Sequence, residues 1–300
     1  MSAKLIVIVT PTFNRSENLK KLYASLKSQE SYNFKWMIID DGSEDQTKVI
    51  VENFVEQANF TVEYYYQNNG GKGRALNNAF KRVEVEELVL IVDSDDYLLP
   101  RATKIIESYY KSYQQEKNIG AFLFYYQHEN GKVLQHAKHT PIINDIVMSR
   151  QKFNIEYGKN DGCICYFRDA INKYHYPEYD NEKYSAPTII QMSMFPEYTM
   201  LFSPTVVGVA EYLPNGLTNS GRKLRLQNPK NMLHYEKLVI QDASFLVKAK
   251  QCTLMWVNYR LLGQSFLDVL KVERSHVVYM LLAYLPSIVI EFSYKLKKYL

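Results

Sequence analysis

The feature that most constrains the fold of this sequence is the alternation of short apolar runs with amphipathic segments in its first 120 residues. The apolar runs are typical of strands buried in a parallel sheet, and they cover residues 5–9, 36–39, 61–66 and 88–92. The other segments have apolar residues at helical spacing, and they cover residues 16–28, 45–55, 74–83 and 100–117. This order predicts an α/β fold, in which a ligand binds beyond the carboxyl ends of the parallel strands.

After about residue 119 the pattern changes. Residues 121–135 have the pattern of a β-hairpin around Asn130-Gly131, and further candidate strands cover residues 163–167 and 206–211. Residues 222–250 have a helical pattern, which is less regular near Pro229. The sequence therefore predicts an α/β half, a second half with further strands, and a mainly helical C-terminal extension.

Composition excludes several classes of protein. The chain of 300 residues is 46% hydrophobic and 23% charged, which excludes a disordered or fibrous chain. Its net charge of +4 is too small for a dedicated nucleic-acid binder. The three cysteines are odd in number and too few for a disulfide framework. Because the N-terminus lacks the features of a signal peptide, we expect a cytoplasmic protein.

Two clusters of acidic residues follow predicted strands. Asp40 and Asp41 come directly after one strand, and Asp93, Asp95 and Asp96 come after another. Carboxylates that meet at one sheet edge repel each other unless a cation or the donor groups of a ligand compensate. Oxygen ligands without nearby His or Cys favour Mg²⁺ or Mn²⁺, which is typically held by one or two carboxylates and substrate phosphates. The alternative is that these acids only cap the helices that follow.

A glycine-rich segment, Asn69-Gly70-Gly71-Lys72-Gly73-Arg74, precedes the third predicted helix. It lacks the Gly-Lys-Ser/Thr ending of a Walker loop and the last glycine of a dinucleotide-binding fingerprint. Glycines beside Lys72 and Arg74 at a helix N-terminus suit the binding of an anion. A plain turn before the helix is the alternative interpretation.

Four motifs, in their order and spacing, resemble the family-2 glycosyltransferases. The motifs are Ile6 to Arg15 (IVIVTPTFNR), Asp40-Asp41-Gly42-Ser43, Asn69-Gly70-Gly71-Lys72 and Asp93-Ser94-Asp95-Asp96. The resemblance implies a GT-A fold, which contains a Rossmann-like nucleotide-binding sheet, and inverting transfer from a nucleotide-activated sugar. Four ordered motifs make the resemblance specific, whereas a lone Asp-x-Asp motif would not.

The resemblance also implies roles for the matching residues. It implies a nucleotide site in which Asp41 accepts a hydrogen bond from the base and Asp93 is directed toward the ribose. The implied nucleotide-binding residues are Pro11, Phe13, Arg15, Asp41, Lys72 and Asp93. The implied metal site binds Mn²⁺ or Mg²⁺, and its candidate ligands are Asp95 and Asp96.

The second half is similar to a bacterial subgroup of this family that builds capsular, exopolysaccharide or teichoic-acid chains. Residues 176–184 resemble its acidic acceptor-side segment, and residues 211–219 resemble a signature that follows. The subgroup commonly has a Pro-Glu pair shortly after the acidic segment, but Pro187 stands here where the Glu is expected. An inverting transfer needs a carboxylate base, and the best remaining candidate is Glu182. Glu178 and Asp180 are the next candidates for the base. The alternative interpretation of each of these three residues is a solvated surface acid.

The C-terminal part contains two further features. Arg222, Lys223 and Arg225 suit either the binding of a diphosphate or a charged helix face. Residues 277–292 are almost wholly apolar, but these 16 residues include Pro286, and a spanning helix needs roughly 20, so we expect no transmembrane helix. Two interpretations stay open for this run: a packed helix, or an interfacial helix on the inner leaflet of the membrane.

Together, these features predict an inverting glycosyltransferase. We expect a nucleotide-sugar donor of the UDP-sugar class and a glycan or polyprenyl-diphosphate-linked acceptor in cell-surface polysaccharide synthesis. Residues 1–120 are expected to form the nucleotide-sugar-binding half of a GT-A domain, residues 121–220 its acceptor-binding half, and residues 221–300 the helical extension. The alternative function is a non-catalytic nucleotide-sugar-binding or assembly scaffold protein.

Overall fold

The computed structural model describes residues 5–84, 86–134, 141–158, 162–210, 221–241 and 243–296. The chain divides into two compact units. Unit 1 comprises Met1–Tyr176 and Ile190–Leu213, and unit 2 comprises Pro177–Ile189 and Pro214–Leu300. The expected helical extension therefore falls in unit 2, together with the acidic segment that the sequence assigned to the acceptor-binding half.

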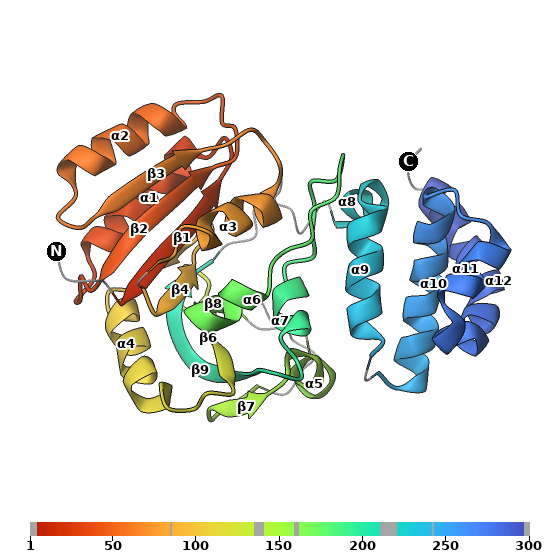
Figure 1. The fold of residues 1–300 in the computed structure, drawn as a ribbon. Helices are drawn as coiled ribbons and strands as arrows, with labels where there is room; N and C mark the ends of the chain where they lie inside the picture. Colours follow the sequence, from red (N-terminus) through yellow and green to blue (C-terminus); the bar gives the residue numbers. More distant parts are fainter. Residues whose placement is uncertain are drawn as a thin grey trace. The chain divides into compact units, whose positions relative to one another are not determined.

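Unit 1 is built on one mixed sheet (Figure 1). Within the described ranges the sheet has nine strands in the order β3-β2-β1-β4-β8-β6-β9-β5, and β7 pairs with β9 off this path. The strands are β1 (Ile6–Thr12), β2 (Phe34–Asp40), β3 (Val62–Tyr66), β4 (Leu88–Ile91), β5 (Tyr97–Leu98), β6 (Ile119–Gln127), β7 (Ile146–Met148), β8 (Gly162–Phe167) and β9 (Thr199–Val209).

The first four strands of the sequence are parallel to one another. Thr12 at the end of β1 lies opposite Asp40 of β2, and Asp40 lies opposite Tyr66 of β3. On the other side of β1, Val9 lies opposite Ile91 of β4. The loops that follow these strands therefore begin at the same edge of the sheet, as the α/β pattern predicts.

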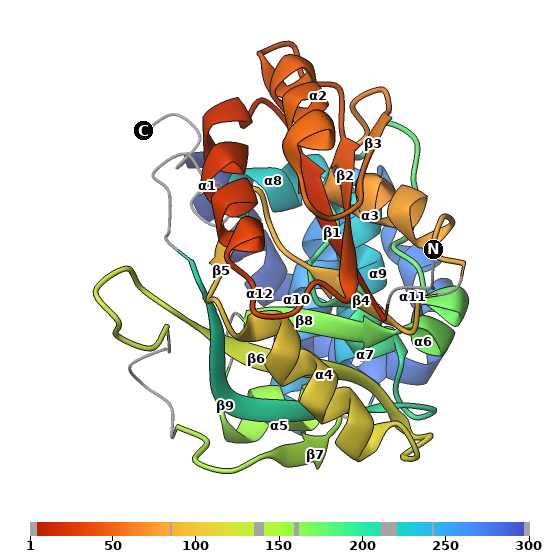
Figure 2. The same ribbon diagram turned by 90° about the vertical axis from the view of Figure 1, so that its left-hand side faces the viewer.

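Helices cover both faces of the parallel part of the sheet (Figures 1 and 2). The helices of this region are α1 (Ser16–Lys27), α2 (Thr47–Gln57), α3 (Lys72–Phe80) and α4 (Ala102–Tyr113). On one face, the ring of Tyr23 in α1 stacks on Phe54 in α2 with centroids 4.1 Å apart. These two rings pack over Trp36, whose indole N–H donates to Thr10 Oγ1 at 2.9 Å. The other face of the strands is packed by α3.

The second half of unit 1 contains antiparallel strands and short helices. β8 is antiparallel to both β4 and β6, and β6 is parallel to β9. Within the described residues, the expected hairpin around Asn130-Gly131 is reduced to one bridge between Gln127 and Val133, because β8 and β9 already occupy both edges of β6. The short helices are α5 (Arg150–Glu156), α6 (Arg168–Lys173) and α7 (Ile189–Ser193). The signature at 211–219 lies outside the described residues.

Unit 2 is mainly helical in its described part. Its helices are α8 (Gly221–Gln227), α9 (Pro229–Val239), α10 (Phe245–Leu261), α11 (Phe266–Val272) and α12 (Val277–Leu296), with a 3₁₀ turn at Arg274–His276. Pro229 begins α9, which is a position where the missing N–H of proline costs no hydrogen bond. α12 packs on α10, where the indole N–H of Trp256 donates to the carbonyl oxygen of Met280 at 2.7 Å.

One face of α12 is an exposed apolar stripe. Met280 and Ala283 on the opposite face are buried in the core of unit 2. The helical stretch Arg274–Tyr294 has 21 residues and contains an 18-residue segment with a mean hydropathy of 1.6, of which 17% is buried, so by length and composition alone it is able to cross a membrane. The expectation that this run is too short to span is therefore wrong on length, because the helix continues beyond the apolar residues. The apolar stripe comprises Val278, Leu281, Leu282, Leu285, Ile288, Val289 and Phe292.

Candidate active site

The loops after β1 and β2 are tied to each other by hydrogen bonds. The backbone N–H of Asn14 donates to Ser43 Oγ at 2.9 Å, and that of Glu44 donates to Asn14 Oδ1 at 2.8 Å. The first N–H of α1, from Ser16, donates to Asp45 Oδ2 at 3.1 Å. Partial burial acts to raise the pKa of Asp45, but hydrogen bonds from Thr47 and Ser16 outweigh it and hold the pKa below its usual value. The cap of α1 thus comes from Asp45.

Asp41 holds the glycine-rich segment in place. Its carboxylate is buried and accepts hydrogen bonds from the N–H of Gly70 at 2.8 Å and from the N–H of Gly71 at 2.7 Å. The amide of Gln67 donates to the same carboxylate at 2.7 Å, and the amide of Asn69 donates to the Asp41 carbonyl at 2.9 Å. A carboxylate that accepts backbone N–H groups is a strong anchor. In this structure Asp41 therefore fixes the loop that leads into α3.

Gly42 makes this close approach of the two loops possible. Its φ of +86° lies in the left-handed region, and a Cβ at this position would lie 2.9 Å from the backbone nitrogen of Asn69. Asp40, two residues before Gly42, is also used internally: its carboxylate accepts from the Tyr64 hydroxyl at 2.6 Å and from the N–H of Ser43 at 2.8 Å. The carboxylates of Asp40 and Asp41 thus accept hydrogen bonds from within the protein. The second acidic cluster is therefore the candidate for binding a cation.

Lys72 and Asp93 form an ion pair at the carboxyl edge. Lys72 is the first residue of α3, and its Nζ donates to Asp93 Oδ2 at 2.5 Å. Burial lowers the pKa of Lys72, but the carboxylates of Asp93, Asp96 and Asp95 outweigh it and raise the pKa. The other oxygen of Asp93, Oδ1, is buried and has no hydrogen-bond partner among the described residues. Asp93 therefore has an acceptor left over for a ligand.

Asp95 lies in the tight turn that follows β4. The turn is closed by a hydrogen bond of 3.0 Å from the N–H of Asp96 to the carbonyl oxygen of Asp93. Burial raises the pKa of Asp95, and the charge of Asp93 raises it further, while Arg15 and Lys72 act in the opposite direction. Four of the implied site residues therefore interact electrostatically at one place, namely Arg15, Lys72, Asp93 and Asp95.

The carboxylates of this turn fit a divalent cation. The buried, unpartnered Oδ1 of Asp93 and the repulsion between Asp93 and Asp95 would both be relieved by a cation. Within the part of the chain that the structure describes, no group of three or more His, Cys, Asp or Glu side chains is placed to hold a metal. A cation here would therefore take phosphate oxygens as further ligands, as Mg²⁺ and Mn²⁺ commonly do.

The remaining implied nucleotide-binding residues also lie at this edge. Pro11 is buried in β1 opposite Ile39 of β2. Phe13, one residue beyond β1, exposes 46% of its surface. Arg15 is the residue that precedes α1. An exposed aromatic ring at the carboxyl edge is able to stack on a planar group.

Glu182 has a different environment from the one expected of a base. It belongs to unit 2, and only 7% of it is exposed. Its two carboxylate oxygens accept from the backbone N–H groups of Lys230 and Asn231, each at 2.8 Å, and from the Asn231 amide at 3.0 Å. These N–H groups lie in the first turn of α9, so Glu182 caps this helix. The role of Glu182 as a base stays a prediction, and this geometry argues against it.

The sequence patterns did not reveal Asn77. Its buried side chain pairs with the backbone of Tyr176: the amide donates to the Tyr176 carbonyl and accepts from the Tyr176 N–H, both at 2.9 Å. The Tyr176 ring is buried, which raises the pKa of its hydroxyl, and the charge of Asp93 raises the pKa further. Asn77 thus fixes a tyrosine beside the acidic turn. In the sequence, the position of Asn77 on the apolar face of an amphipathic helix could have indicated that its side chain has a buried hydrogen-bond partner.

The sequence matches one protein-family model. The model described as glycosyl transferase family 2 matches residues 7–175. TarS of Staphylococcus aureus, a poly(ribitol-phosphate) beta-N-acetylglucosaminyltransferase, is 39% identical over 93 residues, which are 30% of this chain and 16% of TarS. A GalNAc(5)-diNAcBac-PP-undecaprenol beta-1,3-glucosyltransferase of Campylobacter jejuni is 36% identical over 104 residues, which are 33% of this chain and 32% of that protein. The chain thus matches at most about a third of the length of these two relatives.

Solved structures match over a larger part of the chain. Residues 1–349 of S. aureus TarS in complex with UDP-GlcNAc superpose with a TM-score of 0.61 and 19% identity, covering 94% of this chain and 80% of that chain. The mannosyltransferase PcManGT of Pyrobaculum calidifontis, in complex with GDP-Man and Mn²⁺, gives a TM-score of 0.56 and 13% identity, covering 98% and 85%. At these identities the likeness establishes the fold, and it confirms the predicted GT-A fold with a helical C-terminal part.

Proposed function

The chain belongs to glycosyl transferase family 2, and from this premise we propose that unit 1 transfers a sugar from a UDP-sugar to a hydroxyl group of an acceptor. The observation that carries the proposal is the Lys72–Asp93 pair beside Asp95, with one buried oxygen of Asp93 that has no partner in the described part of the chain. A nucleoside diphosphate offers anionic oxygens to Lys72 and to a cation held by the acidic turn. The S. aureus structure with UDP-GlcNAc supports uracil as the base of the donor.

We assign the donor site to the residues at the carboxyl edge of the sheet. Phe13 and Arg15 are proposed to contact the base and the phosphates of the nucleotide. Asp41 is proposed to accept a hydrogen bond from the base. Lys72 and Asp93 would contact the phosphates and the ribose. The complete proposed nucleotide site is Pro11, Phe13, Arg15, Asp41, Lys72 and Asp93, and the proposed metal ligands are Asp95 and Asp96.

The residues of this site suit the departure of a diphosphate. A divalent cation, Mn²⁺ or Mg²⁺, would neutralise charge on the leaving diphosphate when bound there. Lys72 keeps its positive charge because of the surrounding carboxylates, so it stabilises the same developing charge from the side of α3. The products named for the two relatives are β-linked. Because UDP-sugars are α-linked, this supports an inverting transfer, which requires a carboxylate base that takes the proton of the acceptor hydroxyl.

We propose that the acceptor is a glycan or a polyprenyl-diphosphate-linked glycan of the cell surface. The relative in S. aureus is named for a poly(ribitol-phosphate) acceptor. The relative in C. jejuni is named for a saccharide on diphosphate-undecaprenol. The two names describe a polyol-phosphate chain and a lipid-linked saccharide, and both support this class of acceptor.

The proposal is tested by the release of UDP. The full chain is incubated with Mn²⁺ and UDP-GlcNAc, UDP-glucose or UDP-galactose, each with and without lipid-linked and soluble glycan acceptors. We expect one donor to release UDP faster when an acceptor is present. Asp95→Ala, in the acidic turn, should lose this release. The matched control is Asp145→Ala, which removes an exposed carboxylate of unit 1 outside the acidic turn and should keep it. Donor binding without any turnover would instead support the alternative function, a non-catalytic nucleotide-sugar-binding scaffold.

We further propose that the apolar stripe of α12 attaches the protein to the cytoplasmic face of the membrane. Val278, Leu285 and Val289 of the stripe are each more than half exposed, at 61%, 70% and 69%. The opposite face of α12 is held in unit 2 by Met280 and Ala283, which favours a helix lying in the interface over one that crosses the bilayer. Three lysines follow in the sequence and would favour an anionic surface; they are Lys295, Lys297 and Lys298.

Sedimentation with vesicles tests this attachment. We expect the full chain to pellet with phosphatidylglycerol vesicles, and the double variant Leu285→Asp/Val289→Asp to stay in solution. Both side chains are exposed, so the variant should fold. Ile143→Asp, at an 82% exposed position of unit 1, is the matched control and should pellet like the unmodified chain. Equal pelleting of the chain and the double variant would contradict the proposal.

A further inference from the structure

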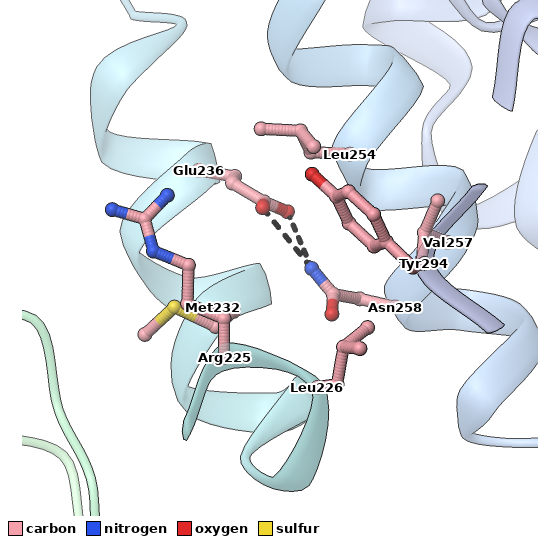
Figure 3. Close-up of a pocket in the computed structure, with 8 residues that line it drawn as sticks. All are labelled: Arg225, Leu226, Met232, Glu236, Leu254, Val257, Asn258 and Tyr294. Carbon is pink, nitrogen blue, oxygen red and sulfur yellow. Dashed lines mark hydrogen bonds between the residues drawn. The ribbon is translucent and has the colours of Figure 1, made fainter. Parts of the chain in front are cut away.

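Unit 2 contains a cavity of its own. Its volume is about 310 Å³, near the lower end of the range for ligand pockets. Four helices of unit 2 provide its walls: α8, α9, α10 and α12 (Figure 3). The lining residues are Arg225, Leu226, Met232, Glu236, Leu254, Val257, Asn258 and Tyr294.

A carboxyl–amide pair forms the polar part of the cavity. Glu236 of α9 and Asn258 of α10 are each 5% exposed. The Asn258 amide nitrogen donates to both carboxyl oxygens of Glu236, at 3.1 and 2.9 Å (Figure 3). Burial raises the pKa of Glu236 to about 8, although Asn258 and the charge of Arg225 act in the opposite direction. At neutral pH this carboxyl group is therefore largely protonated and able both to donate and to accept.

A purely structural role does not explain this pair. A buried carboxyl group is costly, and aliphatic side chains of similar size would pack the same helices at least as well. Among the residues that the structure describes, none fills the space beside Glu236, as the cavity shows. A polar pair that faces an open cavity is a typical arrangement for orienting a ligand.

Two classes of ligand fit this lining poorly. A cation would meet the guanidinium group of Arg225, while Glu236, largely protonated, offers it no compensating charge. A wholly apolar ligand would cover the Glu236–Asn258 pair without offering it a hydrogen-bond partner. A neutral polyhydroxyl group avoids both conflicts, because hydroxyls donate and accept, while the C–H groups of a sugar pack against aliphatic walls and the Tyr294 ring.

We propose that this cavity binds one saccharide or polyol unit, with Glu236 and Asn258 as its hydrogen-bonding partners and Met232, Leu254 and Val257 as its apolar contacts. Where unit 1 is the transferase proposed above, this unit belongs to the acceptor glycan, and unit 2 holds the acceptor through it. The cavity thereby adds a binding site for the acceptor that is separate from the donor residues.

The methyl group of Met232 reports on occupation of this cavity. The full chain is labelled with ¹³C-methyl methionine and titrated with N-acetylglucosamine, glucose and ribitol, and with glucosamine as a cationic analogue. We expect at least one neutral compound to shift the Met232 signal. Met255 and Met280, which are buried in unit 2 but do not line the cavity, should not shift. Glucosamine, whose ammonium group would meet Arg225, should bind more weakly than the neutral compounds.

Two variants connect the binding to the polar pair. Glu236→Leu/Asn258→Leu removes both hydrogen-bonding groups together, so neither is left buried without its partner, and it should weaken binding about 10-fold or more. Glu236→Gln retains a donor and an acceptor and should bind within about 3-fold of the unmodified chain. Both variants should keep the affinity of unit 1 for UDP.

Two results would overturn the proposal: no shift of Met232 with any neutral compound, or equal binding by the double-leucine variant. UDP binding and UDP release, measured on the same samples, report separately on the proposed transferase. A chain that binds saccharides at Met232 but never releases UDP keeps this inference and loses the proposed function. A chain that releases UDP but shows no Met232 shift does the reverse.

Discussion

The ammonium group of Lys72 lies 2.5 Å from Oδ2 of Asp93, which joins the start of α3 to the acidic turn after β4. The pair joins residues 21 positions apart in the sequence at the carboxyl edge of the sheet. A cation at a helix N-terminus is disfavoured by the helix dipole, so the neighbouring carboxylates of Asp93, Asp95 and Asp96 are what make this position favourable for Lys72.

Lys72→Met should weaken UDP binding, because it removes the charge that faces the phosphates and leaves Asp93 without its partner. The loss of a hydrogen bond to a charged group costs about 1.5–3 kcal/mol, which corresponds to a roughly 10- to 100-fold rise in Kd. Isothermal titration calorimetry measures this effect. Lys104→Met, which removes a surface lysine paired with Glu30, is the control and should bind UDP normally. Unchanged affinity in Lys72→Met would contradict the assigned role.

Asp41→Asn should loosen the glycine-rich loop. One carboxylate oxygen becomes an NH₂ group, so the N–H of Gly70 or Gly71 faces a donor and loses its acceptor. A buried N–H without a partner costs about 1–3 kcal/mol, and UDP affinity should fall with the order of the loop. Urea unfolding and UDP titration measure the two effects.

Asp40→Asn is the matched control for Asp41→Asn. The hydroxyl of Tyr64 can rotate to accept from the new amide, so the stability loss should be smaller and UDP affinity should be kept. Equal effects of the two variants on UDP binding would show that the acidic cluster acts only through general stability.

Glu182→Gln distinguishes a base from a helix cap. The capping geometry predicts a loss of about 1–2 kcal/mol in stability, because the amide keeps one acceptor oxygen for the first turn of α9. Turnover at a temperature where the variant stays folded should then change little. Loss of a general base would instead lower turnover by about 10²–10⁴-fold at unchanged stability. Thermal unfolding and the rate of UDP release on the same sample separate the two cases, and Asp180→Asn serves as the control.

Glu236 should make stability depend on pH. Its pKa is raised from 4.5 to about 8 in the folded chain, so the folded state keeps a proton that the unfolded state loses. The stabilisation is complete below about pH 4.5 and is lost as the pH rises to 8, at up to about 1.4 kcal/mol per pH unit. Glu236→Gln should remove this slope and be more stable than the unmodified chain at pH 8. Calorimetric melting curves between pH 5.5 and 8.5 measure it, and parallel profiles for the two chains would contradict the shift.

The edge of the sheet was predictable from the sequence, because parallel strands bring their carboxyl ends together regardless of loop detail. The motifs around Asp41, Lys72 and Asp93 therefore fell at the expected place. The different roles of these three residues were not predictable from the sequence. Asp41 accepts from Gly70 and Gly71, 29 and 30 positions further along, and no local pattern states which carboxylate anchors a loop and which faces a ligand.

The helical class of unit 2 was predictable from the sequence, but the contacts between its residues were not. Helical spacing indicated its helices, but Glu182 caps α9 through residues 48 and 49 positions away, and in sequence it resembles any surface acid. The Glu236–Asn258 pair has the same character, since the two residues belong to different helices whose packing decides whether they meet. Which face of α12 stays exposed likewise depends on its packing against α10.

The central claim is that the acidic turn after β4 holds a cation that binds the donor diphosphate. UDP affinity, measured by calorimetry with Mn²⁺ and with EDTA, tests it most directly in the unmodified chain and in Asp95→Ala, which removes a turn carboxylate and no core volume. The account predicts that Mn²⁺ tightens UDP binding about 10-fold or more in the unmodified chain and has little effect in Asp95→Ala. UDP affinity that is the same with Mn²⁺ and with EDTA, or the same in both chains, would contradict it.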